Sequence, residues 1–149
     1  TAKKLLVSVV YTLGIWGVPI MLADGINQHQ MLVVLLFWLM ALANTFLFTL
    51  FERTFLPLED AKDKTERAFR GPAAKFVKLV LVTAILLIFL SLWYFKTYPF
   101  RFLYALLIIA MMDLSMFLMQ TYPQSFIRSR NYKLAIELVF ILPFLMILG

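Results

Sequence analysis

The stretch that decides the fold is residues 31–51, MLVVLLFWLMALANTFLFTLF, in which Asn44 and three threonine or tryptophan side chains interrupt an otherwise apolar run. A helix needs about 20 mostly apolar residues to cross a bilayer. Working outward, four more such runs cover residues 5–23, 77–95, 101–121 and 134–149. None of the five alternates as a barrel strand would. We therefore expect an all-α, polytopic transmembrane helix bundle with about five spans, forming a single domain over residues 1–149.

Composition supports the same class. Hydrophobic residues make up 63% of the chain and charged residues 15%, whereas soluble domains average about 45–50% and about 25%. There is no cysteine, so disulfides, thiolate metal sites and cysteine nucleophiles are excluded. Because the chain begins at Thr1 and its last run is short, we expect a processed or trimmed chain, or a piece of a longer one.

The basic residues are unevenly distributed between the expected loops. All but two of the 14 lysines and arginines fall on one side, before the first span, in the 52–76 connection and its flanks, or between residues 128 and 133. Lys96 and Arg101 fall on the other side. Positive charge marks the cytoplasmic side of a membrane protein, which also argues against nucleic acid as a partner. We expect an integral protein of a bacterial inner membrane, with the N-terminus cytoplasmic and the C-terminus outside.

Polar groups inside apolar runs are functional candidates, because burying them in lipid is expensive. Three qualify, namely Asn44, Asp113 and Glu137. No lysine or arginine is expected at their depth, so Asp113 is predicted to be protonated, hydrated, or hydrogen-bonded to a group such as Asn44 or Ser115. A structural hydrogen bond between helices is an equal alternative for Asp113, and Glu137 is close enough to the membrane surface to reach water.

The long connection at residues 52–76 is rich in both charges. We expect a short helix in its middle, ended by Gly71-Pro72. Glu59 and Asp63 are four residues apart, so they share a helix face and are candidate ligands for Mg²⁺. Arg67 and Arg70, with Lys64, could then bind phosphate. The alternative is a solvated loop helix with ion pairs between residues four apart. His29, the one histidine, is expected in an outer loop, where triad or metal chemistry has no support.

The order of these features resembles the C-terminal half of the UbiA-type membrane prenyltransferase superfamily. The resemblance rests on "LANTFLFTLFE" at residues 42–52, "LPLEDAKDKTERAF" at 56–69 and "NYKLAIELVFILPFLMILG" at 131–149. It covers most of this chain but about half of a family member. The acidic segment is an E-x-x-x-D variant of the D-x-x-x-D motif that holds Mg²⁺ in the family.

The resemblance implies transfer of a polyprenyl group from its diphosphate with Mg²⁺, in membrane lipid. It implies Glu59 and Asp63 as metal ligands, Asn44 and Asp60 as catalytic residues, and Lys64, Arg67 and Arg70 as ligands of the isoprenyl diphosphate. A missing N-terminal half or a partner subunit would complete the site. Two alternatives stay open: a non-enzymatic membrane subunit or scaffold whose charged loop docks a partner, and a transporter fragment with Asp113 as a proton-linked group.

Overall fold

The computed structural model describes residues 2–22, 27–54, 67–95 and 99–128, with residues 134 and 137 as isolated helical positions. The helices with defined bounds are α1 (Ala2–Leu22), α2 (Gln28–Thr54), α4 (Pro72–Tyr94), α5 (Phe100–Thr121) and α6 (Pro123–Arg128). The predicted all-α bundle is confirmed. Within the described residues, α2 (over Gln28–Glu52), α4 and α5 are long and apolar enough to cross a membrane, which indicates an integral membrane protein.

The other two predicted spans are described less fully. Helix α1 covers nearly all of the run predicted at residues 5–23. Of the run at 134–149, the structure describes Leu134 and Glu137 alone, both helical and exposed. The predicted loop at 52–76 is shorter than expected at both ends, because α2 continues to Thr54 and α4 begins at Pro72.

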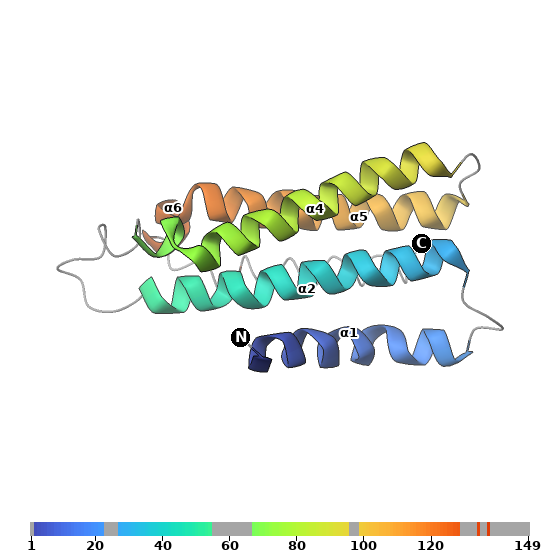
Figure 1. Cartoon of the computed structure of the whole chain (residues 1–149), viewed down its shortest axis with the longest axis horizontal. Helices are drawn as coiled ribbons and strands as arrows, with labels where there is room; N and C mark the ends of the chain where they lie inside the picture. Colours follow the sequence, from blue (N-terminus) through green and yellow to red (C-terminus); the bar gives the residue numbers. More distant parts are fainter. Residues whose placement is uncertain are drawn as a thin grey trace.

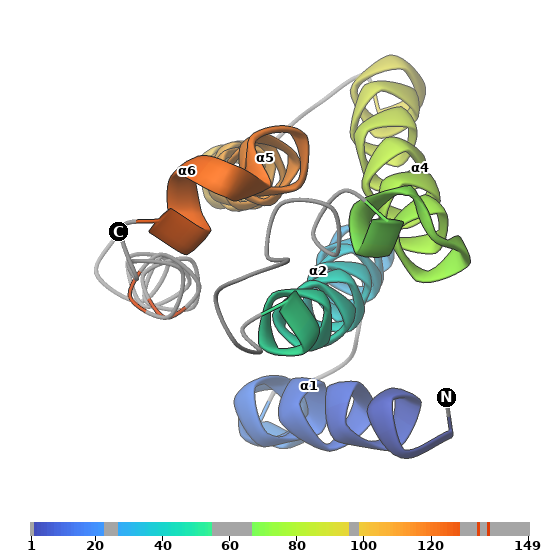
Figure 2. The same ribbon diagram turned by 90° about the vertical axis from the view of Figure 1, so that its left-hand side faces the viewer.

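The four long helices alternate in direction, so that their ends gather at two poles (Figure 1). We call the pole at which α1 and α4 end and α2 and α5 begin the capped end. The opposite pole, which holds the close of α2, the start of α4 and the α5–α6 turn, is the basic end, because Arg67, Arg70, Lys75 and Lys78 lie there. Arg101 is at the capped end. Helix α2 lies between α1 on one side and α4 and α5 on the other (Figure 2).

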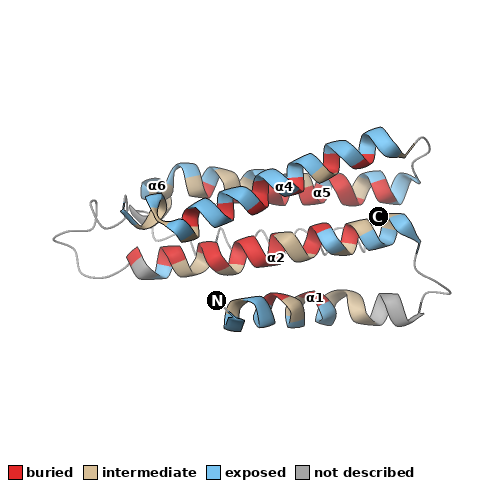
Figure 3. Ribbon diagram, viewed as in Figure 1, coloured by how far each residue is buried: buried red, intermediate tan, exposed pale blue. Residues whose placement is uncertain are grey.

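This central position explains the burial pattern. Helix α2 buries residues on most of its circumference from Leu36 to Phe51, whereas α4 buries one stripe at helical spacing, shown in red in Figure 3. The opposite face of α4 carries exposed Leu86, Phe89 and Trp93. Exposing such an apolar face costs no free energy when the surrounding solvent is lipid, which is the environment of a helix at the lipid boundary.

Helix α2 starts with a reciprocal capping box. The Gln30 backbone N–H donates to Asn27 Oδ1 at 2.9 Å, and the Asn27 N–H donates to Gln30 Oε1 at 3.0 Å. Two otherwise unsatisfied helix donors are thereby satisfied. The start of α4 differs, since its N-cap Gly71 makes no side-chain capping bond and relies on Pro72, whose fixed φ suits a first helical position. The expected break at Gly71-Pro72 is present, and the chain becomes helical again at once.

Three rings close the capped end. The His29 imidazole lies 4.1 Å from the Phe95 ring and 4.7 Å from the Phe102 ring, measured between centroids. The expectation that His29 lies in a loop is wrong: it belongs to the first turn of α2, because the Asn27 cap starts the helix before it. This cluster joins α2 to the end of α4 and the start of α5.

Helix α1 brings a cation deeper than expected. Lys4 Nζ lies 4.7 Å from the centroid of the Phe46 ring, and Phe46 is two residues beyond Asn44 on α2. The expectation that no basic residue shares the depth of the buried polar groups is therefore wrong for Asn44. The sequence could not show this, because the relative shift of α1 and α2 depends on their packing.

Candidate functional site

The two polar residues predicted inside α2 and α5 are both buried. Asn44 is 3% exposed and Asp113 0% exposed. Neither expected partner is found for Asp113, since Ser115 Oγ donates to the Met111 carbonyl at 2.8 Å and no bond joins Asp113 to Asn44. Both carboxyl oxygens of Asp113, and Oδ1 of Asn44, have no hydrogen-bond partner among the described residues.

The contact between His29 and Phe102 sets the register of α2 against α5. With a rise of about 1.5 Å per residue, Asn44 lies about 22 Å beyond His29, and Asp113 about 16 Å beyond Phe102. Both helices run from the capped end toward the basic end. Asn44 is therefore about one turn nearer the basic end than Asp113, which explains why the two side chains do not pair.

Gln120 is a buried polar residue that the sequence analysis did not single out. Its Nε2 donates to the Ala74 carbonyl at 2.6 Å and so ties α5 to the first turn of α4. Its Oε1 is buried with no partner among the described residues. Gln120 is seven residues after Asp113 and so shares its face of α5. A glutamine in the last turn of an apolar run was the available signal, but such a residue ordinarily reaches the membrane surface.

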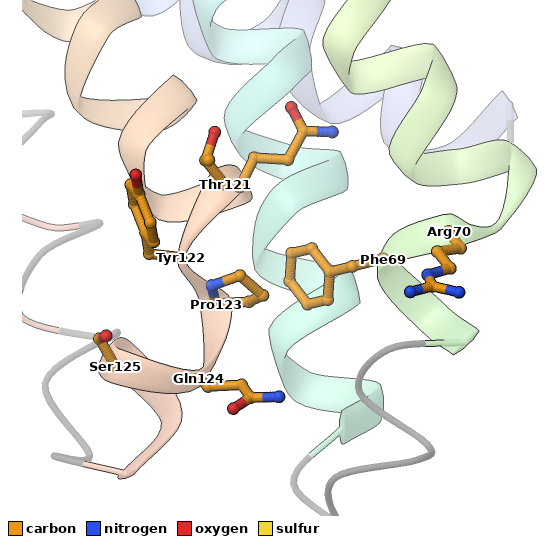
Figure 4. Close-up of a pocket in the computed structure, with 8 residues that line it drawn as sticks. Phe69, Arg70, Thr121, Tyr122, Pro123, Gln124 and Ser125 are labelled. Carbon is orange, nitrogen blue, oxygen red and sulfur yellow. The ribbon is translucent and has the colours of Figure 1, made fainter.

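A pocket of about 440 Å³ lies at the basic end, between the helical turn that precedes α4 and the α5–α6 turn (Figure 4). Phe69 and Arg70 come from the first segment. The Phe69 ring points toward Pro123, and Arg70 lies on the far side of Phe69 (Figure 4). The remaining lining residues are Gln120, Thr121, Tyr122, Gln124 and Ser125. One guanidinium, two side-chain amides and three hydroxyls, next to aromatic rings, can bind an anionic group that carries an apolar tail.

The structure separates the two arginines that were assigned together. Arg70 lines the pocket, whereas Arg67, on the same exposed turn, does not. Glu59, Asp60, Asp63 and Lys64 lie outside the described residues. Within the described part of the chain no cluster of histidine, aspartate and glutamate could hold a metal ion.

Comparisons of the chain with models of known protein families, with curated proteins and with solved structures found no match. The site is therefore interpreted from its own residues.

Proposed function

We propose that this chain is a prenyltransferase-like membrane protein that takes a polyprenyl diphosphate at its basic end, with that end in the cytoplasm of a bacterium. The orientation follows the excess of basic residues at this pole. The chain would supply one half of the site, and the other half would come from further spans or a partner subunit.

The observation that supports the proposal is the pocket at the basic end. It combines Arg70 with polar groups at the end of a bundle whose outer faces are apolar. A polyprenyl diphosphate has the same division, since its diphosphate belongs at the membrane surface and its tail in the hydrocarbon. Arg70 would contact the diphosphate, by the bidentate geometry that guanidinium groups offer to phosphate.

The acidic segment would act from the adjoining connection. Glu59 and Asp63 would hold Mg²⁺, with Asp60 in support and Lys64 near the diphosphate. The ion would supply neutralisation of the leaving diphosphate charge. In the reaction, the allylic C–O bond breaks, the diphosphate leaves with the electron pair, and the acceptor nucleophile bonds to the allylic carbon and loses its proton. Asn44 would help orient the site from within α2.

The test is Mg²⁺-dependent binding of a labelled polyprenyl diphosphate to the purified full chain in nanodiscs. The Glu59→Gln/Asp63→Asn variant should lose the Mg²⁺ dependence. Arg70→Gln should weaken binding by roughly tenfold or more, as expected for a lost charge-assisted contact. Arg67→Gln is the matched control, because it removes the same charge from the same turn without touching the pocket.

Equal effects of the two arginine substitutions would mean that Arg70 acts only through its positive charge at the surface and not through a specific contact in the pocket. Absence of Mg²⁺-dependent binding, in the chain and in the double variant alike, would overturn the proposal. The remaining candidate would then be a non-enzymatic subunit whose basic loop docks anionic lipid or a partner.

A further inference from the structure

Between Asp113 and the pocket, oxygen atoms without hydrogen-bond partners lie at successive depths along the bundle. Asp113 lies about 16 Å from the level of the His29–Phe102 contact, Asn44 about 22 Å and Gln120 about 27 Å, at 1.5 Å per residue. Gln120 also lines the pocket at the basic end. We call Asp113, Asn44 and Gln120 the polar track.

All four unsatisfied atoms of the polar track are acceptors: Asp113 Oδ1 and Oδ2, Asn44 Oδ1 and Gln120 Oε1. Only a hydrogen-bond donor can satisfy an acceptor, and the described residues supply no donor to these four atoms. Leaving such groups dry costs about 1–3 kcal/mol each. Water is the donor that commonly satisfies buried polar groups without a protein partner, and a buried water ordinarily makes about three hydrogen bonds.

We infer that the polar track is a hydrated half-channel, through which water and protons pass from the pocket at the basic end to Asp113 in the membrane interior. At its inner end the Asp113 carboxylate takes a proton from hydronium, giving the neutral acid and water, and returns it by the reverse step. Asn44 and Gln120 hold the intervening waters. This inference does not depend on prenyl transfer.

The groups packed around α5 are consistent with this role. The described titratable or charged side chains on α2 and α4 lie within about two turns of a helix end: His29, Glu52, Lys75, Lys78 and Tyr94. On α1, Lys4 lies over Phe46, nearer the basic end than Asp113. Lys78 lies within about one turn of the depth of Asp113, but Lys78 is exposed whereas Asp113 is buried. Neither carboxyl oxygen of Asp113 has a partner among the described residues, so a proton rather than an ion pair is what can neutralise the carboxylate there.

The chain contains no cysteine, which allows a direct test. Single cysteines are placed at positions 113, 44 and 120 (D113C, N44C, Q120C) in the full chain in nanodiscs. Each has a control at the adjacent residue of the same helix, at nearly the same depth: M112C and A43C, which are as buried as Asp113 and Asn44, and M119C, which is more buried than Gln120. The probe is a small, charged thiosulfonate, which reacts with the thiolate and therefore needs water at the site.

Each polar-track cysteine should react at least about tenfold faster than its adjacent control, because a thiol in a dry environment stays protonated and only the thiolate reacts. The rates should fall in the order Q120C, N44C, D113C. Equal rates within each pair, or reaction at D113C with none at N44C and Q120C, would overturn the inference.

A second measurement avoids substitution of the track. On transfer of the unmodified chain to D₂O, the infrared carbonyl band of a protonated Asp113, identified by its loss in Asp113→Asn, should exchange within the mixing time. Asn44→Leu and Gln120→Leu should each slow that exchange by about tenfold. A band that does not exchange, or that exchanges at the same rate in both variants, contradicts the half-channel.

Discussion

The two halves of the bundle leave different kinds of buried atoms unsatisfied. Among the described residues of the half nearer the capped end, these are ring nitrogens: His29 Nε2, Trp16 Nε1 and Trp38 Nε1. The His29 and Trp16 rings also contact other rings. From the level of Asp113 to the basic end the unsatisfied atoms are carboxyl and amide oxygens. Rings can pack on rings and stay dry, whereas a carboxyl group cannot. The difference indicates that ring packing holds the capped half together, whereas the basic half buries polar groups that protein packing does not satisfy.

The strongest test of this difference is to remove one aromatic ring from each end of the bundle and compare the two losses of stability. Phe102→Ala should lower the free energy of unfolding by about 3–5 kcal/mol, because Phe102 is buried against His29 and Phe95. Tyr122→Ala, at the exposed pocket of the basic end, should change it by less than about 0.5 kcal/mol. Denaturation of the two variants in detergent measures both. Similar losses would mean that the basic end is equally structural.

Asp113→Leu tests whether a buried polar group in the basic half destabilises the fold. Leucine is close to aspartate in shape and removes a buried carboxyl group that has no protein hydrogen-bond partner, so the free energy of unfolding should rise by about 1–3 kcal/mol. The same denaturation experiment measures it, with Ser115→Ala as the control for a hydroxyl already bonded to its own helix. A loss of stability in Asp113→Leu would show that the carboxyl is well bonded and structural.

Asn27→Ala probes the capped end at its surface. It removes one half of the capping box and should cost about 1 kcal/mol. Hydrogen exchange should show the loss locally, as faster exchange of the first-turn amides of α2. Gly71→Ala at the start of α4 loses no side-chain capping bond, although a Cβ there would lie 3.2 Å from the Ala68 carbonyl oxygen. Protection of α2 that survives Asn27→Ala would contradict the capping role.

Gln120→Leu is expected to have the smallest effect. It loses the bond to the Ala74 carbonyl, and bonds between membrane helices are worth about 0.6 kcal/mol on average. Gln124→Leu is the control, since Gln124 lines the same pocket but is exposed. A calorimetric or denaturant measurement that finds the two variants equal would mean that the α4–α5 tie contributes nothing.

Much of the fold was predictable from the sequence, since α2, α4 and α5 coincide with apolar runs and their backbone must be satisfied within each helix. The burial of Asn44 and Asp113 was also foreseeable, because a polar residue in such a run must face the protein interior or a wet cavity. Register was not. The bond from Gln120 to Ala74 and the shift of Lys4 to the level of Phe46 join residues far apart in sequence. No local pattern encodes how far one helix slides along another.

The position of Lys4 has a consequence for the surrounding bilayer. Phe46 lies about 12 Å from the end of α2 at Thr54, so the ammonium group of Lys4 meets α2 well inside the length of its neighbour. A lysine at that depth extends toward phosphate headgroups and draws them and water inward. We therefore expect the hydrocarbon layer to be thinner beside α1 than beside α4, so that the membrane is dimpled on one flank of the protein.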